Sequence, residues 1–213
     1  MTEIHDSTLE LFRAARAALG QASDLLDTGL GEIVDEESQP PAWTYPVGSD
    51  EFPVGDWYCA QLHEWSQSNY YGHTGVDLNG DRANWGDIDR GQPVWAVTDG
   101  IIVDVGSSAS WLGVVVLLVR EGGKPLWLRY AHLAWDSITV DAGDFVRAGH
   151  HLGNLGDYGP GPTKGDHLHF DAARDSIWWP CYRTRSIYWI DPVPVLKAHL
   201  DPAVVDAMLE GGP

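Results

Sequence analysis

Short runs of apolar and β-branched residues, separated by clusters of glycine, asparagine and aspartate, occupy the chain from Trp43 to about Pro192. No helical period appears between these runs, and their close spacing leaves little room for crossover helices. The pattern therefore predicts a mainly β domain with an antiparallel sheet. The clearest predicted strands are residues 93–97, 100–105, 113–119, 126–133 and 168–172.

The N-terminal segment has a different pattern, which predicts a helix over residues 7–27. Ser7 at the cap and Glu10 three residues later fit a capping box. Apolar residues then recur at spacings of three and four and form one stripe. We expect an N-terminal helical arm whose stripe packs on its own domain, forms a homodimer, contacts a partner protein or covers the domain as a propeptide does.

The C-terminal end predicts two short helices from residue 194 onwards. Asp201 and Pro202 are a typical N-cap and first-turn proline for the second of them. The sequence thus divides into a helical arm with an acidic linker over residues 1–41, a β domain over residues 42–196 and a helical tail over residues 197–213.

Composition narrows the classes of partner. The chain has 13 basic and 31 acidic residues, which gives a net charge of −18. Phosphate backbones and anionic lipids repel such a chain, so we expect no nucleic acid and no membrane among its partners. The longest apolar run, residues 114–119, is far shorter than the roughly 20 residues of a membrane helix, and it predicts a buried strand instead.

The first residues and the two cysteines bear on where the protein works. The N-terminus lacks the basic and apolar regions of a secretory signal. We therefore expect a protein that stays inside the cell or leaves it by another route. Cys59 and Cys181 predict either one long-range disulfide or two buried thiols.

Two pairs of polar residues have the spacing of a functional site. His73 and Asp77 are four residues apart, so their side chains project to the same side in a helix and in a strand. His167 and His169 alternate with apolar residues, so both face one side of the predicted strand while their apolar neighbours face the other. Taken singly, each pair is also compatible with a surface cluster that binds nothing.

A further histidine, His132, lies near the end of the strand predicted over residues 126–133. Strict alternation places it on the same face as Leu126, Leu128 and Tyr130. By itself, a histidine in that position is more typical of a half-buried structural residue than of a catalyst.

Taken together, these residues indicate a catalytic zinc site. His73, Asp77 and one histidine of the His167/His169 pair provide two imidazoles and one carboxylate, which leaves a fourth position for water. Zinc lowers the pKa of such a water to about 7 and polarises a carbonyl. His132 and the remaining histidine of the pair are then candidates for the general base and for the group that stabilises the oxyanion.

These motifs resemble those of the lysostaphin-type zinc endopeptidases, which cleave the cross-bridges or stem peptides of peptidoglycan. The family pattern is His-x-Gly-x-Asp, then a histidine on a later strand, then His-x-His. Here these are His73-Thr-Gly-Val-Asp77, His132 and His167-Leu-His169. The connecting segments also resemble the family, and the match covers roughly residues 46 to 196.

The resemblance implies a role for each residue. His73, Asp77 and His169 would bind one zinc ion per chain, and His132 and His167 would be the catalytic residues beside it. It further implies a small, mostly antiparallel β-sheet fold and a peptidoglycan peptide as the substrate. A protein that acts on the cell wall without a secretory signal would be exported by another route, as a phage-encoded lytic enzyme is. The alternative is a module of the same fold that binds zinc and has a regulatory or structural role without hydrolysis.

Two features depart from the family pattern. Asp166 stands where a small residue or proline is usual, and a carboxylate close to His167 would raise the pKa of that histidine. The loop over residues 79–89 is longer than in the simplest members and rich in oxygen ligands, which makes it a candidate for a second cation. Arg82 stands where a calcium loop requires glycine.

Overall fold

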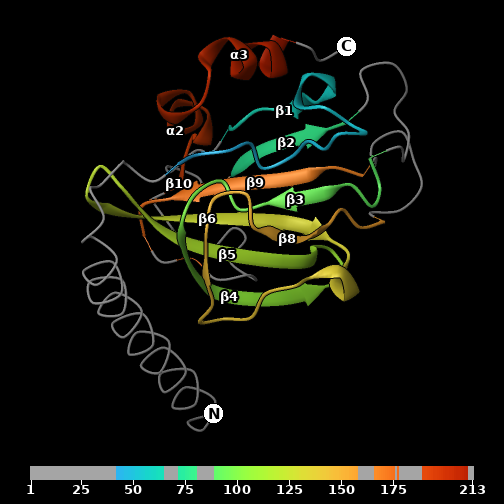
Figure 1. Ribbon diagram of the computed structural model, residues 1–213, viewed down its shortest axis with the longest axis vertical. Coiled ribbons are helices and arrows are strands. Elements are labelled where there is room, and N and C mark those ends of the chain that lie inside the picture. The colour runs from blue at the N-terminus through green and yellow to red at the C-terminus, as the bar shows by residue number, and fades with distance from the viewer. Residues whose placement is uncertain are drawn as a thin grey trace, which may run out of the picture. The chain divides into compact units, whose positions relative to one another are not determined.

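The computed structural model in Figure 1 describes residues 42–64, 72–80, 89–157, 166–175, 177 and 189–210. Residues 41–213 form one compact unit. The helix predicted over residues 7–27 and the acidic linker lie outside the described residues, as does Cys181.

An antiparallel sheet of eight strands dominates this unit, which confirms the predicted mainly β fold. Strand β10 (Trp189–Ile190) pairs with one end of β9, and a separate two-stranded sheet consists of β3 (Pro93–Trp95) and β8 (His151–Asn154). The remaining strands of the large sheet, in spatial order, are β1 (Tyr58–Gln61), β2 (Gly75–Asn79), β9 (Leu168–Ala173), β6 (Lys124–Leu133), β5 (Leu112–Glu121), β4 (Gly100–Ser108) and β7 (Phe145–Val146).

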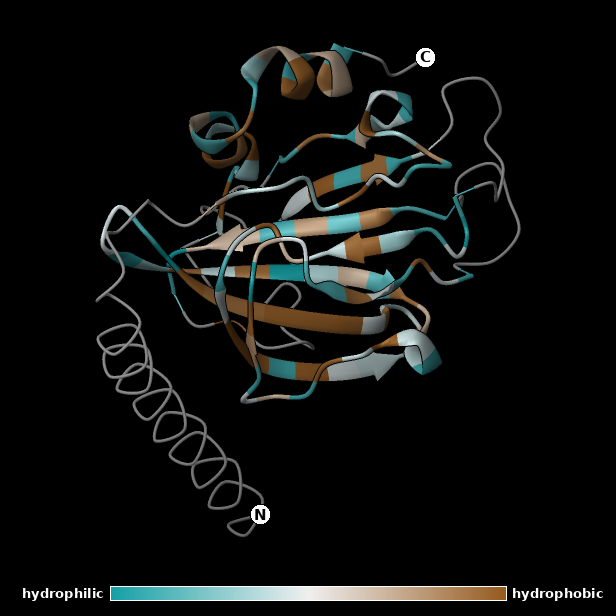
Figure 2. Cartoon of the chain, in the orientation of Figure 1, coloured by the Kyte–Doolittle hydropathy of each residue, from teal (hydrophilic) through white to brown (hydrophobic). Residues whose placement is uncertain are grey.

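Strand β5 contains the longest apolar run of the chain, and both of its faces are buried. Val115 and Leu117 belong to one apolar cluster, whereas Val114 and Val116 belong to a second cluster on the opposite face. Figure 2 shows β5 as almost continuously hydrophobic, while the neighbouring β6 changes between hydrophobic and hydrophilic along its length. A strand buried on both sides needs no alternation, which explains why this run has none.

The two faces of the large sheet carry different residues where β2, β9 and β6 lie side by side. On one face, which we call the core face, Val76, Phe170 and Tyr130 are paired across the three strands. They belong to the main apolar cluster together with Val94 of β3 and Leu152 of β8, and the small sheet lies over this side in Figure 1. The opposite face, the site face, carries the polar residues described below.

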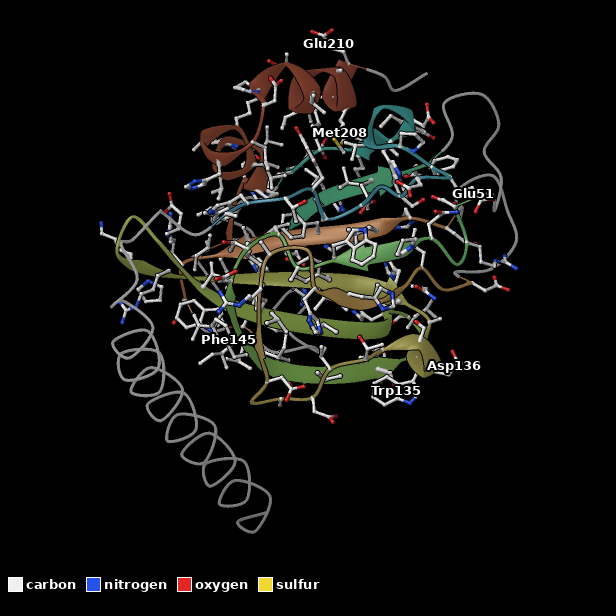
Figure 3. The ribbon with its side chains drawn as sticks, in the orientation of Figure 1. Glu51, Trp135, Asp136, Phe145, Met208 and Glu210 are labelled. Carbon is white, nitrogen blue, oxygen red and sulfur yellow. The ribbon has the colours of Figure 1, made fainter. Side chains whose placement is uncertain are left out.

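Two helices follow β10, as predicted: α2 (Pro192–His199) and α3 (Pro202–Glu210). Helix α2 begins at Pro192 rather than at residue 194, because the Asp191 carboxylate caps it by accepting a hydrogen bond from the Val193 N–H at 3.0 Å. Met208 points from α3 toward the sheet, whereas Glu210 points away (Figure 3). Neither helix is long and apolar enough to span a membrane.

Cys59 is a free thiol within the main apolar cluster. Burial, reinforced by the nearby charge of Asp77, raises the pKa of this thiol to about 12. Of the two alternatives for this residue, the structure therefore shows a buried, unreactive thiol.

Candidate metal centre

Strands β2 and β9 bring the predicted ligands together on the site face. Asp77 and His169 are direct partners across the two strands, and His73 lies just before β2. Asp77 Oδ1 is 3.0 Å from His73 Nε2 and 2.8 Å from His169 Nδ1, and these two nitrogens are 3.0 Å apart. Two donor atoms from one short motif and a third from a residue 92 positions after Asp77 thus surround one point.

The outer nitrogen of each imidazole is held by a second group. His73 Nδ1 donates a hydrogen bond to the Leu62 carbonyl at 3.0 Å, which leaves Nε2 as the donor atom of that ring. His169 Nε2 lies 3.0 Å from Asp171 Oδ1, which leaves Nδ1 directed at the common point. Metal-ligating histidines are typically oriented in this way by a carbonyl or carboxylate behind them.

Steric contacts in this structure explain why the His-x-Gly-x-Asp motif has a glycine at position 75. Gly75 is paired with Asp171 across β2 and β9. A Cβ atom on Gly75 would lie 2.2 Å from the carbonyl oxygen of Phe170 and 2.9 Å from Asp171 Oδ1. Glycine therefore allows the two strands to approach each other closely beside the carboxylate that holds His169.

His132 lies on the site face, so the prediction that it shares a face with Tyr130 is wrong. Consecutive residues of β5 pair with Ala131 and Leu133, which leaves His132 as the extra residue of a β-bulge. Its φ of +68° is in the left-handed region, which is uncommon for a residue other than glycine. The bulge turns the imidazole away from the core and toward His167, whose ring centroid is 4.6 Å from that of His132.

His167 directly precedes β9 and lies on the site face, as its predicted alternation with Leu168 and His169 requires. Its Nε2 is 3.7 Å from Asp77 Oδ1, so it lies beside the three donor atoms. The fully buried carboxylate of Asp166 is ion-paired with Arg90, with 2.8 Å between Oδ2 and Nε. The direct ionic partner of Asp166 in the structure is thus Arg90.

The electrostatics of the group favour a cation at its centre. Burial alone would raise the pKa of Asp77, but hydrogen bonds from His169 and His73 outweigh it and hold this pKa well below its usual range. Burial alone would lower the pKa of His169, but the carboxylates of Asp171 and Asp77 outweigh it and raise this pKa to about 9. Because histidine binds a metal in its deprotonated form, a metal ion here would compete with a proton for His169.

The pKa of His132 is shifted in the opposite direction to that of His169. Burial, together with the charges of the neighbouring His167 and His169, holds the pKa of His132 well below its usual range. This imidazole is therefore neutral at physiological pH, in contrast to His169.

The donor set fits a zinc ion. Two imidazole nitrogens and one carboxylate oxygen are the ligands of many catalytic zinc sites, and donors on a zinc tetrahedron stand about 3.3 Å apart, close to the separations described above. Within the part of the chain that the structure describes, His73, Asp77 and His169 are the one such group that could hold a metal ion. Residues 81–88 of the loop considered for a second cation lie outside the described residues.

Sequence reasoning missed two residues of this centre, Asp171 and Arg129. Asp171 is two positions after His169, so strand alternation alone would have placed it on the same face. Arg129 is its direct partner on β6. Only the pairing of β6 with β9 shows that this arginine lies behind the site, and no motif in the sequence marks that pairing.

Comparison with known proteins gives a family and a fold. The model of peptidase family M23 matches residues 71–178, about half of the chain. No curated protein matches. Among solved structures, lysostaphin in solution is 25% identical with a TM-score of 0.50, over 73% of this chain and 55% of its own.

Two further structures share the fold. A putative glycyl-glycine endopeptidase lytM from Ruminococcus gnavus ATCC 29149 is 24% identical with a TM-score of 0.52, over 75% of this chain and 61% of its own. The protein cbpa from L. salivarius REN is 22% identical with a TM-score of 0.50, over 74% of this chain and 96% of its own. The chain thus spans little more than half the length of the first two structures.

Proposed function

The chain belongs to peptidase family M23, and on that premise we propose that it is a zinc-dependent endopeptidase acting on peptide bonds in peptidoglycan cross-bridges or stem peptides. The observation that carries the proposal is the convergence of His73 Nε2, Asp77 Oδ1 and His169 Nδ1 within 3.0 Å of one another. These three atoms would hold one zinc ion per chain. The substrate class is supported by family membership and by the resemblance of the motifs.

Bound at this position, zinc would supply an acidified water and polarise the carbonyl of the scissile peptide. His167 lies beside the donor group, with its Nε2 3.7 Å from Asp77 Oδ1, and we assign it the role of general base. A general base holds the proton of the water and then delivers it to the leaving amine.

His132 has a complementary role in this proposal. It is neutral because its pKa is held low, so its N–H can donate a hydrogen bond to an oxyanion without the ring carrying a charge. Groups of this kind act by being fixed before the charge develops. The β-bulge and the left-handed backbone of His132 provide that fixed position.

The test combines metal content, turnover and product identity. Purified protein should retain about one zinc per chain after dialysis, and it should release peptide fragments from purified peptidoglycan. Digestion of muropeptides of defined structure, followed by mass spectrometry, identifies the bond that is cut. Zinc-loaded protein that releases no fragment would contradict the endopeptidase proposal and favour the non-hydrolytic, zinc-binding module.

A further inference from the structure

Arg129 carries a fully buried positive charge behind the metal centre, in the middle of β6. Its direct partner on β9 is Asp171, which is also fully buried. Arg129 Nε donates to Asp171 Oδ2 at 2.7 Å, and a terminal nitrogen of the same guanidinium is 2.5 Å from that oxygen. Such a pair is costly to bury, so its location against the site requires an explanation.

The Asp171 carboxylate links this arginine to a metal ligand. Its Oδ2 faces Arg129, while its Oδ1 lies 3.0 Å from His169 Nε2. A carboxylate fixed through one oxygen cannot rotate away from the histidine that its other oxygen contacts. Arg129 therefore fixes the plane of the carboxylate, and the carboxylate fixes the ring of His169.

A second connection runs from Arg129 to His132. The guanidinium carbon lies 4.5 Å from the ring centroid of Trp111 and 4.8 Å from that of Trp189, so the cation is held between two indoles. Trp111 is stacked on His132, with the ring centroids 5.7 Å apart and the planes at 11°. The Trp111 carbonyl also accepts a hydrogen bond from the His132 N–H at 3.0 Å.

We propose that Arg129 is a positioning residue for both halves of the site: it fixes the metal ligand His169 through Asp171 and the bulged His132 through Trp111. The role assigned to His132 depends on the proposed function, whereas the link to His169 requires only that the site binds metal. An arginine suits this place because its planar fork can bind a carboxylate at its edge while its faces stack on aromatic rings, which a lysine cannot do.

Three variants separate the two connections. Asp171→Asn should weaken zinc binding about 10- to 100-fold while lowering kcat at saturating zinc by less than about threefold. Trp111→Leu should lower kcat about tenfold or more and weaken zinc binding less than Asp171→Asn does, because the Trp111 ring is stacked on His132 and meets His169 only edge-on, with centroids 5.3 Å apart. Arg129→Leu should show both losses. Zinc binding is measured by competition with a chelator, and kcat with a peptide substrate in zinc-buffered solution.

The absorption spectrum of the Co²⁺-substituted protein gives a readout that does not depend on activity. Arg129→Leu and Asp171→Asn should change the d–d bands of bound cobalt, whereas Arg174→Leu should leave them as in the wild type. Arg174 is a matched control because it directly follows β9 and is ion-paired with Glu121. A purely structural role for Arg129 would lower the unfolding temperature and leave the cobalt spectrum and the kcat of the folded, zinc-saturated fraction unchanged.

Arg129→Lys covers the case in which Arg129→Leu does not fold. It keeps the charge but loses the fork and the stacking, and we expect about a threefold to tenfold loss in both zinc affinity and kcat. Wild-type values for zinc affinity, cobalt spectrum and kcat in this variant would overturn the inference. Zinc-loaded wild type without peptidase activity would instead overturn the proposed function, while the affinity and cobalt measurements would still test the link to His169.

Discussion

The two faces of strand β9 differ sharply although they belong to the same six residues. The core face carries Leu168 and Phe170, both fully buried among apolar side chains. The site face carries His169 and Asp171, which are equally buried but surrounded by polar and charged groups. The apolar face fixes the strand, so the polar face can hold ionisable groups in one arrangement even though each of them would be better solvated in water.

The same contrast appears on β6, where the backbone itself differs near the site. Leu128 and Tyr130 follow regular alternation on the core face. Beyond them the β-bulge at His132 interrupts the alternation and turns one residue to the site face. Irregular backbone of this kind persists only where the surrounding structure holds it, and it is found frequently next to active sites.

The largest expected difference between the faces is in metal binding. His169→Ala removes one of the three proposed donor atoms, so we expect the protein to lose its zinc on dialysis and all measurable peptidase activity. Metal analysis of the dialysed protein provides the measurement. His151→Ala is the control, because His151 binds Asn154 on the small sheet and should keep the metal. Zinc retained at wild-type level in His169→Ala would remove this residue from the ligand set.

Variants of the two histidines that we propose as catalytic should lose turnover but keep the metal. We expect His167→Ala and His132→Ala each to keep about one zinc per chain and to lose about 10²- to 10⁴-fold in kcat, the usual contribution of an acid–base group or an oxyanion donor. Measurements at saturating zinc isolate this effect. Full turnover in either variant would exclude that histidine from the mechanism.

A substitution on the core face of β9 should change the stability of the protein rather than its metal binding. Phe170→Ala removes a fully buried ring that packs against Tyr130 with centroids 5.1 Å apart. The free energy of unfolding should fall by about 3–5 kcal/mol, measured by urea denaturation. The folded fraction should keep zinc at wild-type stoichiometry, because Phe170 points away from the proposed ligands. Loss of zinc from folded protein would show that the two faces are not independent.

Gly75→Ala tests the close approach of β2 and β9. The added Cβ would collide with the Phe170 carbonyl and Asp171 Oδ1, and we expect a loss of about 1–3 kcal/mol in unfolding free energy together with weaker zinc binding. Gly55→Ala is the matched control, because a Cβ there meets nothing within 4 Å. Equal stability and zinc affinity in the two variants would contradict the steric role of Gly75.

The smallest effect concerns Cys59, whose burial raises the pKa of its thiol to about 12. The thiol of the unfolded chain loses its proton near pH 8.5, whereas the folded one does not. The contribution of this thiol to the free energy of unfolding is therefore fully present below pH 8.5 and is lost as the pH rises toward 12. Between pH 7 and 9 the free energy of unfolding of the wild type should fall by about 0.5–1 kcal/mol more than that of Cys59→Ala. Urea denaturation at the two pH values measures the difference, and identical losses would contradict the prediction.

The local pattern of apolar and polar residues was sufficient to predict the main strands and part of the candidate site. The apolar run of β5, the alternation of His167 and His169 with Leu168 and Phe170, and the cap–proline pair at Asp201 and Pro202 all depend on neighbours in the sequence. Periodicity of this kind records which face of an element is buried. It could not give the roles of the five site residues, which rested on resemblance to a family and stay proposals.

The sequence by itself determined the mainly β fold, the facing of His167 and His169, and the residue types that a zinc site requires. Only the tertiary structure decided that His132 turns to the site face and that Arg129 and Asp171 lie behind His169. A bulge depends on the register between β5 and β6, and a buried ion pair depends on which strands are neighbours. Both are set by packing between distant segments, and no local pattern in the chain contains that information.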